Sequence, residues 1–193
     1  MAEIGGKTVG FALTGSFCTY AKIFDEIKKL LDAGAKVVPI MSEASMSTDT
    51  RFGNSADITT RLESLTQTTV ISTIENAEPI GPGGFLDILV IAPCTGNTIA
   101  KLSNAITDGC VTMAAKAHVR NGKPLLLGVS TNDGLSANAK NIGNLLARKN
   151  VFFIPFGQDD PIKKCNSLVF NSELLLPSIE KALDFEQIQP ILV

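Results

Sequence analysis

The chain has 193 residues, a length that favours one domain, and we expect residues 1–193 to form a single unit. Hydrophobic residues make up 45% of the chain, enough for a full core, which excludes a largely disordered protein. The 17 basic and 19 acidic residues leave a net charge of −2 without a basic stripe, which argues against nucleic acid or a polybasic membrane contact as a partner.

The N-terminus has no uninterrupted apolar core or cleavage site of a signal peptide, and the longest apolar runs are too short to span a membrane. The cysteines Cys18, Cys94, Cys110 and Cys165 are widely separated, with no CxxC pair and no histidine nearby. We therefore expect a cytoplasmic protein whose thiols are reduced and lie in the core or line a site, and we expect no metal site.

Apolar runs of strand length alternate with helical spacing along the chain. The predicted strands cover 8–15, 36–42, 85–93, 123–130 and 151–157. The predicted helices cover 20–31 (ended by Gly34), a weak segment at 58–65, 136–150, and a final segment within 172–185 that begins late because of Pro177. This alternation predicts a doubly wound α/β fold of the Rossmann or flavodoxin type, with helices on both faces of a mainly parallel sheet of five or six strands.

Doubly wound folds bind ligands just beyond the carboxyl ends of their strands. Four of the predicted ends carry hydroxyl, amide and glycine groups, and none of them carries Lys or Arg. These ends are Thr14–Ser16, Met41–Glu43, Pro93–Thr98 and Ser130–Asp133. The sequence therefore predicts a polar, uncharged crevice at this edge of the sheet.

Ser16 lies at the start of the helix at 20–31, and two interpretations stay open for it. Its hydroxyl and the free N–H groups of the helix start would cradle a phosphate, or Ser16 is a simple N-cap. A dinucleotide fingerprint is disfavoured, because the first strand end offers only Gly15 where G-x-G-x-x-G is needed. Glu43 alone is weak evidence for a ribose contact. The pattern fits a mononucleotide phosphate better than NAD.

Other polar residues have two interpretations each. His118, the single histidine, falls near a helix end, where a cation stabilises the helix dipole; a catalytic role is the alternative. Asp108 is expected at the start of that same helix. Asn132 and Asp133 have either a turn role or a ligand role. Residues 159–161 are expected to form a loop at the rim of the crevice.

Four segments carry a family resemblance: "TGSFCTYAK", "VVPIMSEAS", "IAPCTGNTIAKLSNAITDG" and "VSTNDGLSANAKNIGNLL". In order and spacing they resemble the flavoprotein family of homo-oligomeric flavin-containing cysteine decarboxylases, which includes phosphopantothenoylcysteine decarboxylases and flavin prenyltransferases. The resemblance covers about residues 7–157. Its most specific part is the third segment, which matches the family's Pro-Ala-(Ser/Thr)-x-Asn-Thr-x-(Ala/Gly)-Lys signature.

The resemblance implies FMN as cofactor and suggests which residues bind it. The FMN phosphate and ribityl chain would be held by Gly15, Ser16, Phe17 and Ser42. The phosphate or the isoalloxazine edge would be held by Thr95, Asn97 and Thr98, with Ala115 nearby. Asn132 falls where the decarboxylases have an Asn that contacts a substrate carboxylate, which implies a substrate-binding role. Lys101 lies inside the signature without a defined role, and no catalytic residue is assigned.

The departures from the family pattern bear on activity. The decarboxylases' active-site His is missing between residues 42 and 93, and their Met and Trp are missing around Asn132. Cysteine decarboxylation is therefore not supported. Within the family, the whole chain is most similar to one component of a two-component oxidoreductase that aromatises a cyclic dicarboxylate, whose companion chain, the A subunit, would carry NAD(P).

The resemblance also implies a homo-oligomer, a trimer or dodecamer, with flavin near the boundary between copies. Two other classes of function stay open. One is a non-catalytic component that binds FMN or substrate and regulates its partner, because the sequence offers no convincing general base. The other is a free-standing flavin-dependent decarboxylase or prenyltransferase.

Overall fold

The computed structural model describes residues 3–193; residues 1 and 2, which belong to the expected unit of 1–193, lie outside the described residues. Within the described part seven strands form one sheet in the order β2-β1-β3-β4-β7-β6, with β5 beside β4. The strands are β1 (Thr8–Leu13), β2 (Lys36–Met41), β3 (Ile88–Cys94), β4 (Leu125–Thr131), β5 (Val151–Phe153), β6 (Phe156–Gly157) and β7 (Leu168–Phe170).

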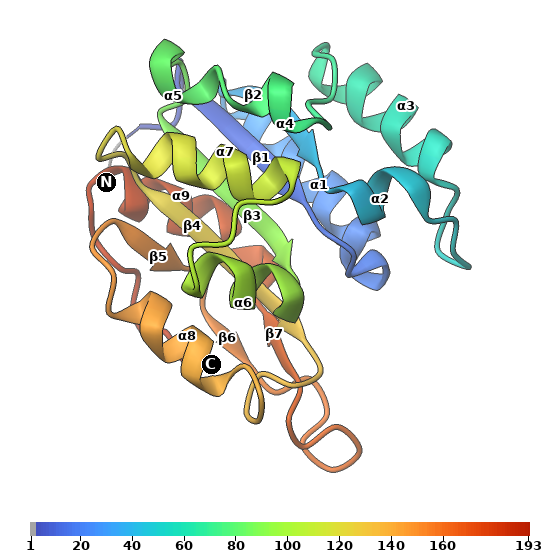
Figure 1. Cartoon of the computed structure of the whole chain (residues 1–193), viewed down its shortest axis with the longest axis vertical. Helices are drawn as coiled ribbons and strands as arrows, with labels where there is room; N and C mark the ends of the chain where they lie inside the picture. The colour runs from blue at the N-terminus through green and yellow to red at the C-terminus, as the bar shows by residue number, and fades with distance from the viewer. Residues whose placement is uncertain (1–2) are drawn as a thin grey trace.

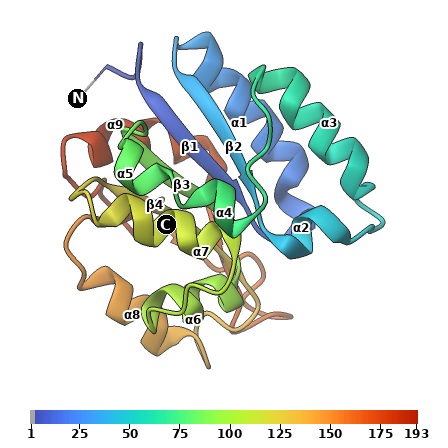
Figure 2. The ribbon, with the colours of Figure 1, turned by 45° about the horizontal axis from the view of Figure 1, so that its top comes forward.

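The helices alternate with these strands and cover both faces of the sheet (Figure 1). They are α1 (Tyr20–Asp32), α2 (Glu43–Ser47), α3 (Ser55–Thr66), α4 (Ile74–Ala77), α5 (Ile80–Gly83), α6 (Gly96–Ser103), α7 (Cys110–Val119), α8 (Ala139–Leu146) and α9 (Leu175–Leu183), with short 3₁₀ turns η1 (Phe17–Thr19) and η2 (Ser172–Leu174). Helices α6 and α7 pack on one face, while α1 and α9 pack on the other. Figure 2 shows α1 and α3 beside β1 and β2, and α6 and α8 at the opposite end of the sheet.

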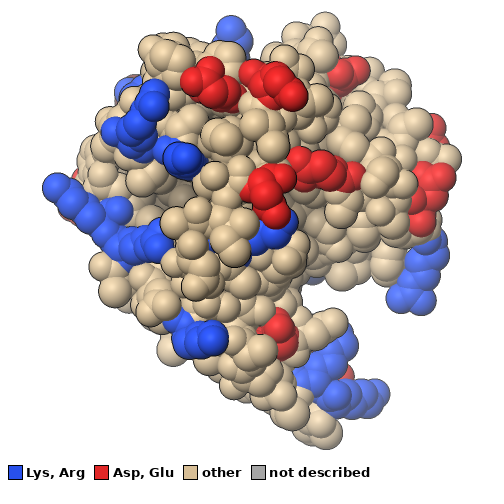
Figure 3. All heavy atoms as spheres, in the orientation of Figure 1, with Lys and Arg blue, Asp and Glu red and all other residues tan. Residues whose placement is uncertain are grey.

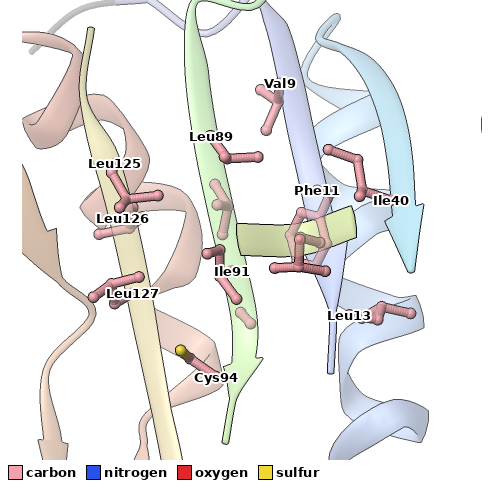
Figure 4. Close-up of a cluster of buried hydrophobic side chains, with 14 of the residues drawn as sticks. Val9, Phe11, Leu13, Ile40, Leu89, Ile91, Cys94, Leu125, Leu126 and Leu127 are labelled. Carbon is pink, nitrogen blue, oxygen red and sulfur yellow. The ribbon is translucent and has the colours of Figure 1, made fainter. Parts of the chain in front are cut away.

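The first five strands run parallel, as predicted. Their continuous Val, Ile and Leu runs are buried from both faces, which is the pattern of a parallel sheet between two helix layers. Figure 4 shows side chains from β1, β2, β3 and β4 meeting in this core, among them Phe11, Ile40, Ile91 and Leu127. The predicted doubly wound fold is confirmed.

The C-terminal part differs from the prediction. The expected strand at 151–157 is broken, because β5 ends at Phe153 and β6 begins after Pro155. The short strand β6 pairs antiparallel with β7, which in turn pairs antiparallel with β4 through Ser130 and Thr131. Seven strands therefore replace the expected five or six within the described residues. This antiparallel pair places the loop at 158–167 beside the carboxyl end of β4.

Helix boundaries also differ from the prediction, and the weak segment at 58–65 is the longer helix α3. The helix expected at 136–150 is shorter, since α8 covers Ala139–Leu146. The final helix begins at Leu175, before Pro177. Backbone N–H groups in the first turn of a helix have no partner within the helix, so a proline, which lacks this group, is tolerated there. Helix α1 matches its prediction, and Gly34 follows it with a φ of +86°, a left-handed conformation that glycine adopts without strain.

Candidate functional site at the carboxyl ends of the strands

Two adjoining cavities open where β1, β3 and β4 end. The larger has a volume of about 590 Å³ and the smaller about 430 Å³, and both are lined by Gly15 and Thr95. Because parallel strands end at the same edge of the sheet, residues that follow three separate strands meet here. This is the edge at which the sequence predicted a polar crevice.

Eight of the residues singled out from the sequence line these cavities. Those in the larger cavity are Ser16, Phe17 and Asn132; those in the smaller are Ser42, Asn97 and Thr98; Gly15 and Thr95 belong to both. Ala115 is buried in α7 and instead lines a separate cavity with Ile106 and Leu145. The topology thus brings together the predicted residues except Ala115, which faces a different part of the molecule.

Thr14 joins the ends of β1 and β3, a role that the sequence analysis missed. Its Oγ1 donates a hydrogen bond to the carbonyl of Pro93 at 2.7 Å and accepts one from the N–H of Thr95 at 3.0 Å. The side chain is only 1% exposed, so both bonds are shielded from water. The only feature of the sequence that could have indicated this role is a threonine at the end of an apolar strand. The bonds fix Gly15 and Thr95 next to each other on the shared wall of the two cavities.

Ser16 does not use its side chain as an N-cap. It precedes η1, but its hydroxyl makes no capping bond to that turn. The Ser16 Oγ instead lies 2.7 Å from the Oγ of Ser130, a residue of β4. The hydroxyl therefore belongs to the cavity wall, and the simple capping interpretation of Ser16 is wrong.

Ser42 and Thr95, in contrast, do cap the helices that follow them. The Oγ of Ser42 accepts from the N–H of Ser45 at 3.3 Å and lies 2.9 Å from the Ser45 Oγ. The Thr95 Oγ1 accepts from the N–H of Thr98 at 3.4 Å and lies 3.1 Å from the Thr98 Oγ1. Three of these four hydroxyls, those of Ser42, Thr95 and Thr98, line the smaller cavity with groups that both donate and accept hydrogen bonds, while the Ser45 hydroxyl is buried behind them.

The Tyr20 phenol supports this wall from the protein interior. Its oxygen lies 2.9 Å from the Thr14 carbonyl and 2.8 Å from the Ser45 Oγ. Burial raises the pKa of Tyr20 to about 12, so the phenol stays protonated and remains a donor at neutral pH. The contact links α1 to the ends of β1 and β2 beneath the cavity.

Gly96 allows the loop after β4 to approach the start of α6. A Cβ at this position would clash with Thr131 Oγ1 and would lie 2.6 Å from Asn138 Nδ2 and 2.8 Å from Asp133 Oδ1, all far too close. A side chain here would push the β4 loop away from α6. Gly96, which stands at a variable position of the signature, is therefore required here by packing along the lining of the larger cavity.

Asp133 is a turn residue. Its carboxylate accepts hydrogen bonds from the Thr131 hydroxyl and from Asn138 Nδ2 at 2.8 Å. The Thr131 bond, reinforced by the one from Asn138, holds the pKa of Asp133 below its usual value. Asn132, between these two anchors, is exposed and faces the larger cavity. The turn thus holds the backbone and leaves the Asn132 amide available to a ligand.

The N-terminus of α7 is occupied by a carboxylate of the protein itself. Oε1 of Glu43 accepts from the N–H of Cys110 at 2.7 Å, the favourable place for an anion at a helix start. A Cβ at Gly109 would come within 2.9 Å of this carboxylate, which explains the glycine. Lys101, which also lines the smaller cavity, forms an ion pair with Asp108 at 2.8 Å. Asp108 lies just before α7 and outside its first turn, so the helix-dipole role that was expected of Asp108 is filled by Glu43 instead.

His118 has a structural role, but not as the cation that its place near a helix end suggested. The side chain is 1% exposed, and Nε2 lies 2.9 Å from the carbonyl of Pro124. Burial lowers the pKa of His118 to about 4, so the imidazole is neutral at physiological pH. Its hydrogen bond links α7 to the start of β4, away from the two cavities.

The cysteines are free, as expected of reduced thiols. Cys94 and Cys110 are buried, and desolvation raises the pKa of both thiols, so they are unreactive core residues. Cys18 is exposed on the wall of the larger cavity, with its Sγ 3.9 Å from the Ser16 Oγ.

Among residues 3–193 no group of three His, Cys, Asp or Glu side chains is arranged to hold a metal ion. No helix in this part of the chain is long and apolar enough to cross a membrane.

The comparisons with known proteins agree with the fold and the motif. The model of the Flavoprotein family matches residues 2–174. The chain is 52% identical over 193 residues to the B subunit of dipicolinate synthase of Bacillus subtilis (strain 168), covering 100% of this chain and 96% of that protein. The crystal structure of the dipicolinate synthase B subunit from Bacillus halodurans C superimposes with a TM-score of 0.91 at 47% identity, covering 100% and 98% of the two chains.

A more distant likeness shows the fold alone. An FMN-dependent cysteine decarboxylase from thioviridamide biosynthesis has a TM-score of 0.57 at 22% identity, over 74% of this chain and 86% of the other. The family match extends over most of the chain and includes every strand end that lines the two cavities. On sequence, fold and motif together, the chain belongs to the Flavoprotein family.

Proposed function

We propose that this chain is the B subunit of a dipicolinate synthase, which binds FMN and acts with an A subunit that carries NAD(P). The observation that carries this proposal is the 52% identity to the B subunit of dipicolinate synthase over 100% of this chain, with nearly equal lengths. The reaction removes a hydride and a proton from a dihydrodipicolinate-type ring and gives pyridine-2,6-dicarboxylate. Its place would be the cytoplasm of the mother cell in a sporulating bacterium.

The residues of the two cavities fit a flavin mononucleotide. The smaller cavity offers the hydroxyls of Ser42, Thr95 and Thr98 beside the start of α6, a donor set suited to a phosphate and a ribityl chain. A Cβ at Gly15 would be in ordinary van der Waals contact with the Phe17 ring at 3.7 Å and with the Ala44 Cβ at 3.9 Å, so packing does not require this glycine, and its missing side chain leaves the shared cavity wall one methyl group shallower. When bound, a flavin supplies a hydride acceptor.

The protein's own residues position the ligands. Ser16 and Ser130 form a hydroxyl pair on the wall of the larger cavity, and the turn at Asp133 presents the Asn132 amide to the same space. An Asn amide N–H at this place donates to a substrate carboxylate. The fold would then orient a hydrogen of the substrate ring toward the hydride acceptor, because proximity and alignment lower the barrier to hydride transfer.

A second candidate function is that of a binding component whose partner carries out the hydride transfer. The acidic residue lining the larger cavity, Asp159, forms an ion pair with Lys164 at 2.8 Å, which lowers the pKa of Asp159. A carboxylate held in this way is a poor proton acceptor at neutral pH. This observation favours a role in which the chain holds FMN or substrate for the A subunit.

We also expect homo-oligomers, trimers or dodecamers, in addition to the A subunit as partner. Large apolar side chains remain exposed in the isolated chain, among them Phe85 (44%), Ile106 (46%) and Leu146 (45%). Light scattering at micromolar concentration measures the assembly state, and a monomer would contradict this part of the proposal.

The test of the function combines the purified chain and the A subunit with the product of dihydrodipicolinate synthase and NAD(P), with and without FMN. Dipicolinate is followed by its ultraviolet absorbance. We expect rapid formation only when both proteins are present. If the A subunit alone forms dipicolinate as fast as the pair, the catalytic proposal is wrong and the binding role is favoured. A rate that requires added FMN indicates that the flavin takes part in the reaction, and a rate that does not change with FMN indicates that it does not.

A further inference from the structure

Two basic side chains from distant parts of the sequence line the larger cavity, Arg51 and Lys164. Figure 3 shows the molecule hollowed between the segment after α2 and the segment between β6 and β7, with Lys or Arg atoms on both rims. The strand ends themselves carry no basic residue. Asp159 is the single acidic residue among the described residues of this lining, so the cavity wall is net positive in a chain of net charge −2.

Arg51 stands on a tight turn that fixes its backbone. Thr50 and Gly53 exchange backbone hydrogen bonds of 3.0 and 3.1 Å, and Gly53 has a φ of +149°. The Arg51 guanidinium lies 4.8 Å from the ring centroid of Phe52, and no carboxylate among residues 3–193 forms an ion pair with it. Its fork of N–H donors is therefore free to bind a carboxylate from outside the chain.

Lys164 stands on the opposite rim and is also held. Its Nζ lies 2.8 Å from Oδ2 of Asp159, and this carboxylate raises the pKa of Lys164, which keeps the ammonium charged. The backbone N–H of Lys164 donates to the Asp160 carbonyl at 2.8 Å, and its own carbonyl accepts from Ser167 at 2.9 Å. With its side chain 54% exposed, Lys164 keeps donors available to a ligand.

An aromatic side chain accompanies the charges. Phe52 lines the same cavity and is 51% exposed. Exposure of a phenyl ring to water is unfavourable, and a flat ligand packed against the ring would cover this apolar surface. Asn132 completes the polar part of the lining. The cavity therefore combines two cations on opposite rims, an amide and an apolar ring.

We infer that Arg51 and Lys164 bind the two carboxylates of a planar dicarboxylate dianion, with Phe52 against its ring. The inference rests on the proposed function and assigns its substrate-binding residues. It also revises the expectation of a crevice without cations: the strand ends lack them, but two loops supply Arg51 and Lys164 to the larger cavity, and α6 supplies Lys101 to the smaller one. The competing role for the same cations is to hold the phosphate of the flavin.

The test measures binding by calorimetry to the full-length, FMN-loaded chain, with dipicolinate (two carboxylates) and picolinate (one carboxylate) as probes. The variants are Arg51→Gln, Arg51→Lys and Lys164→Gln. The matched control is Lys140→Gln, which removes a positive charge from an exposed position outside both cavities. FMN and riboflavin are titrated into the same variants without bound flavin.

We expect Arg51→Gln and Lys164→Gln each to weaken dipicolinate binding about tenfold, the scale for losing one charge-assisted hydrogen bond at a partly exposed site. Picolinate binding should change less, so the preference for the dianion should fall. Arg51→Lys should recover part of the affinity, and Lys140→Gln should bind like the wild type.

Three outcomes would overturn the inference. One is unchanged dipicolinate affinity in both Gln variants; another is no dipicolinate binding by the wild-type chain. The third is a loss of FMN affinity without a loss of riboflavin affinity, which would assign the cations to the flavin phosphate. Turnover by the wild-type chain together with the A subunit distinguishes a failure of this inference from a failure of the proposed function. If the pair is active but dipicolinate does not bind as expected, only the inference is wrong. If the pair is inactive, the proposed function is wrong, and the inference is wrong with it.

Discussion

The hydroxyl oxygens of Ser16 and Ser130 lie 2.7 Å apart, which ties the end of β1 to the end of β4 along the wall of the larger cavity. β3 lies between these two strands in the sheet, so the contact bridges a neighbour. The strand order thus brings together residues that are 114 positions apart in the sequence. The larger cavity depends on this convergence of strand ends.

Ser16→Asp should abolish FMN binding, because a carboxylate in the cavity wall would repel the anionic cofactor and leave Ser130 facing a charge. Ser16→Ala should weaken binding only a few-fold, the scale for one neutral hydrogen bond. Fluorescence quenching of FMN measures both. Ser64→Asp, which places the same charge on an exposed position of α3, should bind like the wild type. Normal FMN affinity in Ser16→Asp would remove Ser16 from the site.

Gly96→Ala should destabilise the fold by about 1–3 kcal/mol, because the added methyl group overpacks the contact with Thr131 and Asn138. The matched control is Gly143→Ala in α8, where nothing lies within 4 Å of the added Cβ. That variant should gain up to about 1 kcal/mol from helix propensity. Urea unfolding of both proteins gives the comparison, and equal stabilities would show that the β4 loop moves freely away from α6.

Asn132→Ala should lower kcat/KM of the two-component complex by about one to two orders of magnitude, the range for losing a polar contact that positions a charged substrate. The control is Asn76→Ala on the exposed face of α4. Steady-state rates of dipicolinate formation measure the effect. Unchanged kinetics would mean that the amide does not contact the substrate.

Stability should fall as the pH drops from about 6.5 to about 4, because His118 is buried with a pKa of about 4 and ionises near 6.5 when unfolded. Between these two pH values the unfolded chain binds a proton on His118 and the folded chain does not. The contribution of His118 to the free energy of unfolding is therefore complete above pH 6.5 and is lost as the pH falls toward 4. The full loss approaches about 3 kcal/mol by linkage. Asp133, whose pKa is lowered by Thr131, adds a further loss only at more acidic pH.

Urea unfolding between pH 4 and pH 8 measures this dependence, and His118→Gln should flatten it in the window between pH 4.5 and 6.5. Because the chain has a single histidine, its imidazole NMR signals report the same group directly. Titration of His118 near its ordinary pKa in the folded protein would contradict the assignment.

The central sheet, and the residues that meet in the two cavities at its edge, could largely be predicted from the sequence. Continuous apolar runs mark β1, β2, β3 and β4, and small polar residues after them mark the edge where ligands bind. The rule that parallel strands end together then sufficed to group Gly15, Ser42 and Thr95 without any distance information.

The remaining features depend on contacts that leave no local pattern. β6 and β7 have two and three residues and derive from pairing with β4, so no periodicity reveals them. Arg51 and Lys164 lie in loops, and only the fold brings them to one cavity. Burial of His118 changes its charge, which its position near a helix end could not indicate.

The most direct test of the site is a calorimetric titration of the full-length chain with FMN, FAD and NAD. We expect FMN to bind most tightly, because hydroxyls and a helix start fit a single phosphate while Gly15 stands without the further glycines that a dinucleotide requires. Tighter binding of NAD than of FMN would contradict the assignment of these cavities to a flavin mononucleotide.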